Sequence, residues 1–285
     1  MIFNLIRPLT STSTTIAFAV VTYPAGATCT ATLGTTVLTA TDTSGYMVFH
    51  LNAIGRWTIT ATDGTSSVSD MVRITAKAQR FTVTLSFRVP TAYREVEYLE
   101  STGTQYINTG FLFQNDLSKR INIKFALLDD LTHSVGGTYD TEIGAASILG
   151  FPAYLVNNGL YYNVAAGSYV LSSATVGGVM TTVFNDSSHA VIENGTTKTT
   201  ITSYAYTCTR PFFLFGINQD GYLAYSGKTR IYYFQFIDNT TGTLLADYIP
   251  VYRKADTVPG FWDTVSETFI TNAGTGTFNR GPIVS

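Results

Sequence analysis

The chain has 285 residues, and its 17 Lys and Arg against 19 Asp and Glu give a formal net charge of −2 at pH 7. This even balance supplies no basic field to recruit nucleic acid and no polybasic patch for an anionic membrane surface. No stretch approaches the roughly 18 apolar residues of a membrane span. The length is sufficient for two domains, and the 18 Tyr, 18 Phe and only 13% charged residues suit a rigid β protein.

The chain opens with an apolar lead, Met1 to Ile6, followed by a Ser/Thr stretch up to residue 12. Apolar side chains of this kind are unusual in a free tail. They fit either an extra edge strand of the first module or an arm that docks onto a partner. The sequence leaves these two interpretations open.

Three segments near the N-terminus resemble the parts of a secretory signal peptide: Arg7, the apolar run 16–21 and residues 25–27. The apolar run is shorter than the ~7–15 residues expected of such a peptide. Its alternation favours a strand instead. We therefore expect no export by this route.

Between Thr14 and Arg88, apolar residues alternate in several short runs separated by turn residues such as Asp63-Gly64. Alternation with a period of two places one face of each strand in a shared core. About seven short strands without a helix predict an immunoglobulin-like β-sandwich over residues 1–89. The alternating sets are Ile16, Phe18 and Val20; Ala27, Cys29, Ala31 and Leu33; Met47, Phe49 and Leu51; Trp57, Ile59 and Ala61; and Phe81, Val83, Leu85 and Phe87.

Two residue types in this region have a functional and a structural interpretation. Trp57 could be a ligand platform, but its phase with Ile59 and Ala61 predicts a core position. Cys29 and Cys208 fall in different modules, so we expect buried free thiols rather than a disulfide. Free thiols fit folding in a reducing cytoplasm.

A short linker, Val89-Pro90-Thr91, precedes a second module over residues 90–285. Residues 92–100 fit either a strand or one or two helical turns. Beyond them the pattern is again all-β, which predicts a jelly-roll β-sandwich. Strand 229–237 is apolar on both faces and is expected to lie deep between two sheets. Hairpin signals occur at Asn158-Gly159, Glu193-Asn194-Gly195, Gln219-Asp220-Gly221 and Asn239 to Gly242.

Several segments carry a resemblance to known modules. Residues 97–110, 247–254, 260–265 and 271–278 resemble the opening and closing signatures of concanavalin A-like (laminin G-like) lectin modules. That version is associated with structural proteins of phages and prophages of gut Gram-positive bacteria. Residues 45–64 resemble bacterial immunoglobulin-like modules of surface and virion proteins. Together these resemblances imply a protein of the phage particle.

An enzymatic function has one candidate motif, the acidic run Glu95, Glu97 and Glu100. A retaining glycoside hydrolase needs two carboxyls about 5–5.5 Å apart on one face. Glu95 and Glu97 share a face of a strand, whereas Glu100 points the other way. The histidines His50, His133 and His189 lie far apart in sequence, without metal-ligand spacing. We therefore expect no catalytic residues and a non-enzymatic protein.

A cofactor is not expected, although a calcium ion has one weak group of candidate ligands. Asp129, Asp130, Asp140 and Glu142 form the only local acidic cluster. Hard cations require six to eight oxygen ligands, and the cluster is equally consistent with a hydrophilic loop.

Carbohydrate binding requires exposed aromatic faces beside amides and carboxylates. Two hairpin regions combine these residue types. The first contains Tyr154, Asn157, Tyr161 and Tyr162, and the second contains Asn218, Asp220 and Tyr222. Both sets also fit tyrosines that cap the edges of a sandwich.

The resemblance implies a virion surface protein, a capsid decoration protein or tail-associated adhesin, assembled in the host cytoplasm. Its N-terminal module would dock on other virion proteins, and its lectin-like module would hold host or mucus glycans. We expect many copies on the particle, or an oligomer, so that avidity compensates for weak single sites. The alternatives are a subunit-cementing protein without glycan binding, a glycoside hydrolase of the same fold, and a bacterial surface adhesin.

Overall fold

A computed structural model describes most of the chain, and it is all-β: the described residues contain no helix. The chain divides into two compact units, residues 1–91 and residues 92–284. The described ranges are 16–41, 43–64, 67–114, 119–129, 134–140, 147–156, 159–164, 167–173, 176–185, 188, 190–200 and 207–284. Over these ranges, no helix combines the length and the apolar composition that crossing a membrane would require.

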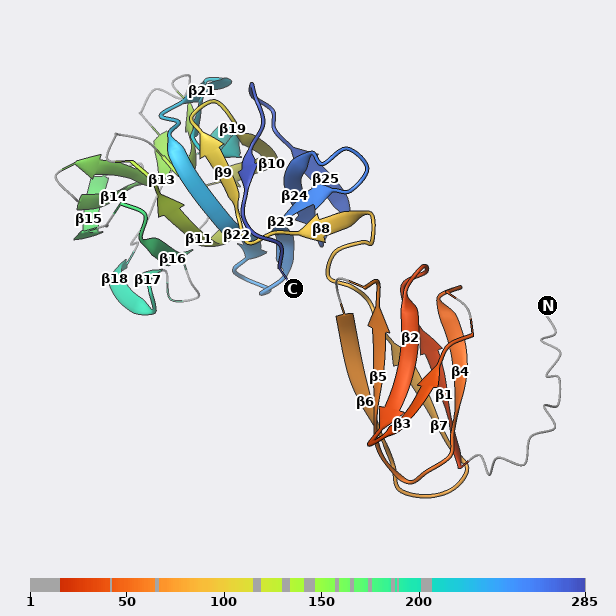
Figure 1. Cartoon of the computed structure of the whole chain (residues 1–285). Helices are drawn as coiled ribbons and strands as arrows, with labels where there is room; N and C mark the ends of the chain where they lie inside the picture. The colour runs from red at the N-terminus through yellow and green to blue at the C-terminus, as the bar shows by residue number, and fades with distance from the viewer. Residues whose placement is uncertain are drawn as a thin grey trace. The chain divides into compact units, whose positions relative to one another are not determined.

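The first unit consists of two sheets that share one core (Figure 1). One sheet has the order β4-β1-β7, in which β1 runs parallel to β7, and the other has the order β3-β2-β5-β6. The predicted apolar lead before residue 16 lies outside the described residues. The strands are β1 (Ala17–Thr22), β2 (Thr28–Leu33), β3 (Thr36–Thr39), β4 (Tyr46–Leu51), β5 (Gly55–Thr62), β6 (Ser67–Ile74) and β7 (Gln79–Thr84).

The core of this unit forms around Trp57, which is fully buried and whose indole Nε1 donates a hydrogen bond to the Ala53 carbonyl at 3.0 Å. The core position predicted for Trp57 is confirmed. Cys29 is a buried free thiol, as expected, and burial raises its pKa to about 11. The side chain of Cys208 lies outside the described part of the chain.

The predicted phase of the first strand is wrong. β1 buries Ala17, Ala19 and Val21, whereas Phe18 is 40% exposed and Val20 is half-buried. Residues 16–21 are apolar at every position, so the sequence pattern does not indicate which face of the strand is buried. The structure buries the smaller side chains and leaves the phenyl ring of Phe18 against the imidazole of His50, with the ring centroids 5.0 Å apart.

The second unit also has two sheets around one core. One sheet follows the order β10-β19-β12-β13-β14-β15, with β20 paired with β12 and β21 paired with β20; the other follows β18-β17-β16-β11-β22-β23-β24-β25, with β8, β9 and β26 attached. Its strands are β8 (Tyr93–Glu95), β9 (Leu99–Thr102), β10 (Ile107–Gln114), β11 (Lys119–Leu127), β12 (Gly136–Asp140), β13 (Ser147–Val156), β14 (Gly159–Val164), β15 (Gly167–Ser173), β16 (Val179–Phe184), β17 (Ala190–Glu193), β18 (Thr196–Thr200), β19 (Thr207–Leu214), β20 (Ile217–Gln219), β21 (Tyr222–Ala224), β22 (Lys228–Asp238), β23 (Leu244–Arg253), β24 (Pro259–Asp263), β25 (Thr268–Thr271) and β26 (Asn279–Arg280).

The central strand of this unit is β22, but it is not buried on both faces as its sequence predicts. Ile231, Phe234 and Phe236 enter the core. On the other face, Tyr232 and Gln235 are only half-buried. A β-bulge in the pairing with β11 makes Tyr232 an extra residue, because Ile231 and Tyr233 lie opposite the adjacent residues Phe125 and Lys124. The bulge shifts the alternation of side chains along β22.

Residues 92–100 form strand rather than helix, which settles the ambiguity of their sequence. β8 pairs with β23 and β9 pairs with β22 (Figure 1). β26 then pairs with β9, so that the two ends of the unit lie beside each other. Trp262, on β24, is 9% exposed and belongs to the buried residues.

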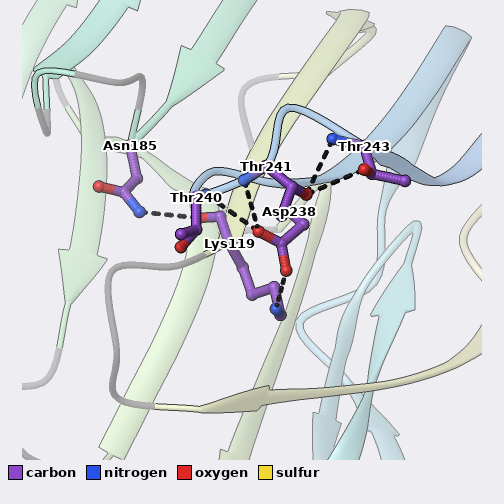
Figure 2. Close-up of polar contacts among 6 residues, drawn as sticks. All are labelled: Lys119, Asn185, Asp238, Thr240, Thr241 and Thr243. Carbon is purple, nitrogen blue, oxygen red and sulfur yellow. Dashed lines mark hydrogen bonds and ion pairs between the residues drawn. The ribbon is translucent and has the colours of Figure 1, made fainter.

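The turn between β22 and β23 is organised by the carboxylate of Asp238 (Figure 2). It accepts hydrogen bonds from the backbone N–H groups of Thr240 and Thr241 and an ion pair from Lys119 Nζ at 3.1 Å. The hydrogen bond from Lys119, followed by the backbone N–H groups, lowers the pKa of Asp238. One carboxylate thus joins this turn to β11.

We predict that Trp57→Ala destabilises the first unit by about 3–5 kcal/mol, because it removes a fully buried indole. Calorimetry should show the loss, while fluorescence of Trp262, then the remaining tryptophan, keeps its unfolding midpoint. Tyr46→Ala, at a half-exposed aromatic of the same unit, serves as control and should change stability by less than about 0.5 kcal/mol. Equal losses in both variants would contradict this account of the core.

We also predict an acid-sensitive contribution from Asp238. Because its pKa in the folded state is lowered, its stabilisation is complete above the unfolded pKa of about 3.9 and is lost as the pH falls through the folded value. Asp238→Asn should flatten the dependence of the unfolding midpoint on pH below about pH 4. Lys119→Met should flatten it as well, since it removes the hydrogen bond that contributes most to the lowered pKa of Asp238. Unchanged pH profiles in both variants would refute the assignment.

Candidate functional site

The candidate site is the hairpin formed by β20 and β21. Its two-residue turn places Asp220 at a φ of 51° and Gly221 at 97°, as the Asp-Gly sequence predicts for a tight hairpin. Tyr222 follows the turn and is 78% exposed, more than any other large hydrophobic side chain among the described residues. The hairpin therefore presents an aromatic ring to solvent.

Asn218, predicted as a ligand-binding amide, supports this hairpin from below. It is 1% exposed; its Nδ2 donates to the Pro211 carbonyl at 2.8 Å, and its Oδ1 accepts from the Gly221 N–H at 2.8 Å. Both ends of the amide are therefore used inside the protein. The structure separates the predicted set into a buried supporting residue, Asn218, and a displayed one, Tyr222.

The base of the hairpin is fixed to the sheet. β20 pairs in parallel with β12, and Ile217 is buried. A side chain at Gly216 would come within 2.6 Å of Leu223, so the chain packs closely where the hairpin begins. This packing holds the backbone of Tyr222 in place, and an ordered backbone loses less entropy on association than a mobile one.

A second exposed tyrosine, Tyr225, follows the hairpin and was missed by sequence reasoning. It is 46% exposed and adopts a left-handed φ of 50°, while its carbonyl accepts the Ser134 N–H at 2.6 Å. A tyrosine is rare in this backbone conformation because its Cβ crowds the main chain. No sequence pattern marks the position.

The neighbouring turn links the hairpin to the two ends of the unit. Ser226 Oγ donates to the Gly103 carbonyl at 2.6 Å. Two hydrogen bonds join Thr104 to Thr275. Thr104 Oγ1 donates to the Thr275 carbonyl at 3.0 Å, and the Thr104 carbonyl accepts from the Thr275 N–H at 3.2 Å. The segments 97–110 and 271–278, singled out in the sequence, are thus joined beside the hairpin.

Three tyrosines of the other predicted carbohydrate-binding set lie on strands of the same sheet as the hairpin. Tyr154 on β13 is directly opposite Tyr161 on β14, and Tyr162 is opposite Tyr169 on β15. Pairing continues from β21 through β20, β12 and β13 to β14, which connects both predicted sets. Asn157 lies outside the described residues.

The acidic run does not assemble three carboxylates on one strand. Glu95 ends β8, whereas Glu100 lies on β9, which pairs with a different neighbour. Glu100 forms an ion pair with Arg230, with Oε2 and Nε 2.7 Å apart, and accepts a hydrogen bond from Asn279. Glu97 is exposed between the two strands.

The predicted calcium ligands are described only in part. Asp129 is half-buried, and Asp140 ends β12, whereas Asp130 and Glu142 lie outside the described residues. Across the described ranges, no group of three or more His, Cys, Asp or Glu side chains is placed to hold a metal ion. His50 contacts Phe18, and the other two histidines fall outside these ranges.

Comparison with known proteins assigns no family to this chain. No protein-family model matches it, and no curated protein sequence matches it either. The candidate site therefore depends on its own geometry, in which a supported hairpin displays Tyr222.

We predict a large effect on stability at Asn218 and a small one at Tyr222. Asn218→Ala removes two buried hydrogen bonds and should lower the free energy of unfolding by about 1–3 kcal/mol. Tyr222→Ala should change it by less than about 0.5 kcal/mol, because the ring is exposed. Urea denaturation followed by Trp262 fluorescence in a Trp57→Phe background measures both. A larger loss in Tyr222→Ala would mean that this ring is structural.

Proposed function

We propose that the chain is a non-enzymatic surface protein of a bacteriophage particle, either a capsid decoration protein or a tail-associated adhesin. In this proposal the first unit docks on other virion proteins. The second unit faces outward and holds glycans of the host surface or of mucus. The sequence resemblance of residues 45–64 and 97–278 to virion-associated modules supports the biological setting.

We also propose a fold family for each of the two units. An immunoglobulin-like first unit is supported by seven described strands in two sheets around one core, with β1 parallel to β7. A concanavalin A-like jelly roll is supported by two large, mostly antiparallel sheets around the core of the second unit. Neither assignment requires the units to have any particular relative position.

The exposure of Tyr222 carries the proposal of glycan binding. A tyrosine ring offers an apolar face for a sugar ring and a hydroxyl for hydrogen bonds. Tyr222 lies at a turn whose backbone is fixed by Asn218, and Tyr225 provides a second exposed ring nearby in the chain. A single shallow contact of this type binds weakly, so display in many copies would supply the avidity.

A second candidate function, cementing of subunits without glycan binding, is favoured by the first unit. On the outward face of the sheet β4-β1-β7, Phe18 and Tyr46 are exposed, and Val20 lies opposite Val48. Apolar residues gathered on one sheet face are typical of a protein interface. This surface fits a virion-docking role under either function.

A glycoside hydrolase is disfavoured by the state of the acidic run. Glu100 is held by Arg230 and Asn279, and it lies on a different strand from Glu95. A retaining mechanism needs a nucleophile and an acid that face each other across the scissile bond. Replacing Glu95 and Glu97 with Gln should therefore leave any hydrolysis unchanged.

We predict that the full chain binds one class of glycan on an array that includes bacterial cell-wall polysaccharides, and that Tyr222→Ala abolishes the signal. Stacking on one aromatic ring contributes about 1 kcal/mol or more, enough to remove a weak interaction at array concentrations. Tyr46→Ala, at an exposed ring of the first unit, is the control and should bind normally. If no glycan on the array is bound while both units are folded, the result would favour the cementing function.

A further inference from the structure

Two arginines lie beside one tyrosine of the larger sheet of the second unit. Arg94 on β8 is directly opposite Tyr252 on β23. Arg280 on β26 places its guanidinium carbon 3.9 Å from the centre of the Tyr252 ring. Three separate strands thus bring two guanidinium groups to one phenol.

These two arginines have no carboxylate partner among the described residues. The Nε atom of Arg94 is buried and has no hydrogen-bond partner there. Nearby acidic side chains are engaged elsewhere: Asp256 pairs with Arg253, and Glu100 pairs with Arg230. Glu95 follows Arg94 on the strand, so its side chain points to the opposite face. The positive charges of Arg94 and Arg280 therefore lie beside the Tyr252 phenol without a carboxylate to neutralise them.

The state of Tyr252 agrees with this electrostatic imbalance. Burial raises the pKa of its phenol, but hydrogen bonding from Arg94 and Arg280, together with their charges, lowers it more, so the net pKa lies below the usual value. The guanidinium carbon of Arg280 lies over the Tyr252 ring in a cation–π contact, and a guanidinium carries several N–H donors, more than one phenol can accept. Arg280 is also exposed, which leaves the group open to a ligand.

We propose that Arg94, Arg280 and Tyr252 form a binding site for a phosphate group. Two guanidinium groups match the several oxygens of a phosphate with charge-assisted hydrogen bonds. The phosphate belongs either to an anionic polymer, such as a phosphate-linked polysaccharide, or to a free ion. The site lies on the sheet that contains β23, whereas Tyr222 belongs to the other sheet, so this inference goes beyond glycan binding and does not depend on it.

Titration calorimetry of the full chain at low ionic strength tests the site, with inorganic phosphate and poly(glycerol phosphate) as probes. We expect binding that weakens with salt, and a Kd raised by about tenfold or more in Arg94→Gln and in Arg280→Gln. Arg253→Gln removes the same charge from β23 and should leave the Kd within about twofold, since Arg253 pairs with Asp256. Binding of free phosphate alone, or of the polymer alone, supports the site and identifies its source.

Several results would overturn the proposal. These are the absence of binding with both probes, an unchanged Kd in Arg280→Gln, and an equal loss in Arg253→Gln, which would indicate a general field of positive charge. Circular dichroism reports whether each variant is folded. Arg94→Lys provides a second test that keeps the charge: because lysine lacks the planar fork, phosphate binding should still weaken.

Discussion

The larger unit depends on the backbone pairing of β22. One of its edges pairs with β11 along nearly the whole strand, from Thr229 to Asp238. The other edge is shared, because β9 takes the N-terminal part and β23 the C-terminal part. Strands from the beginning, the middle and the end of the unit are therefore bound to one element. Its side chains Ile231, Phe234 and Phe236 enter the core that lies between the two sheets.

This arrangement explains how an exposed tyrosine can belong to a rigid surface. Tyr225 and Ser226 connect the hairpin to β22, and both are anchored, the first through Ser134 and the second through Gly103. The turn itself is fixed by the buried amide of Asn218. Binding surfaces benefit when the backbone is ordered before the ligand arrives, because less entropy is lost on association. The same principle applies to Arg94 and Tyr252, which are held by paired strands.

Much of the fold could be predicted from the sequence, because alternation and turn residues are local signals. The core position of Trp57 followed from its phase with Ile59 and Ala61. The phase of β1 could not be predicted, since both of its faces are apolar and only packing selects Ala19 over Phe18.

The candidate site was predictable only in part. The residue types of the hairpin predict both Tyr222 and Asn218 as ligand-binding residues. Only Tyr222 is exposed, whereas Asn218 is buried and supports the turn. Sequence cannot separate an amide that holds a turn from one that meets a ligand, because both favour turns. The cluster of Arg94, Tyr252 and Arg280 joins residues from both ends of the unit, and only strand pairing brings them together.

The most direct test of the account is a nuclear magnetic resonance titration of the full chain with the tightest-binding glycan. We expect the largest shifts at Tyr222, the first residue of β21, and at Tyr225, which follows this strand; both rings are exposed. Resonances of Phe18 and Tyr46 in the first unit should stay unchanged. Shifts confined to the first unit, or to residues remote from this hairpin, would contradict the assignment of the glycan-binding surface.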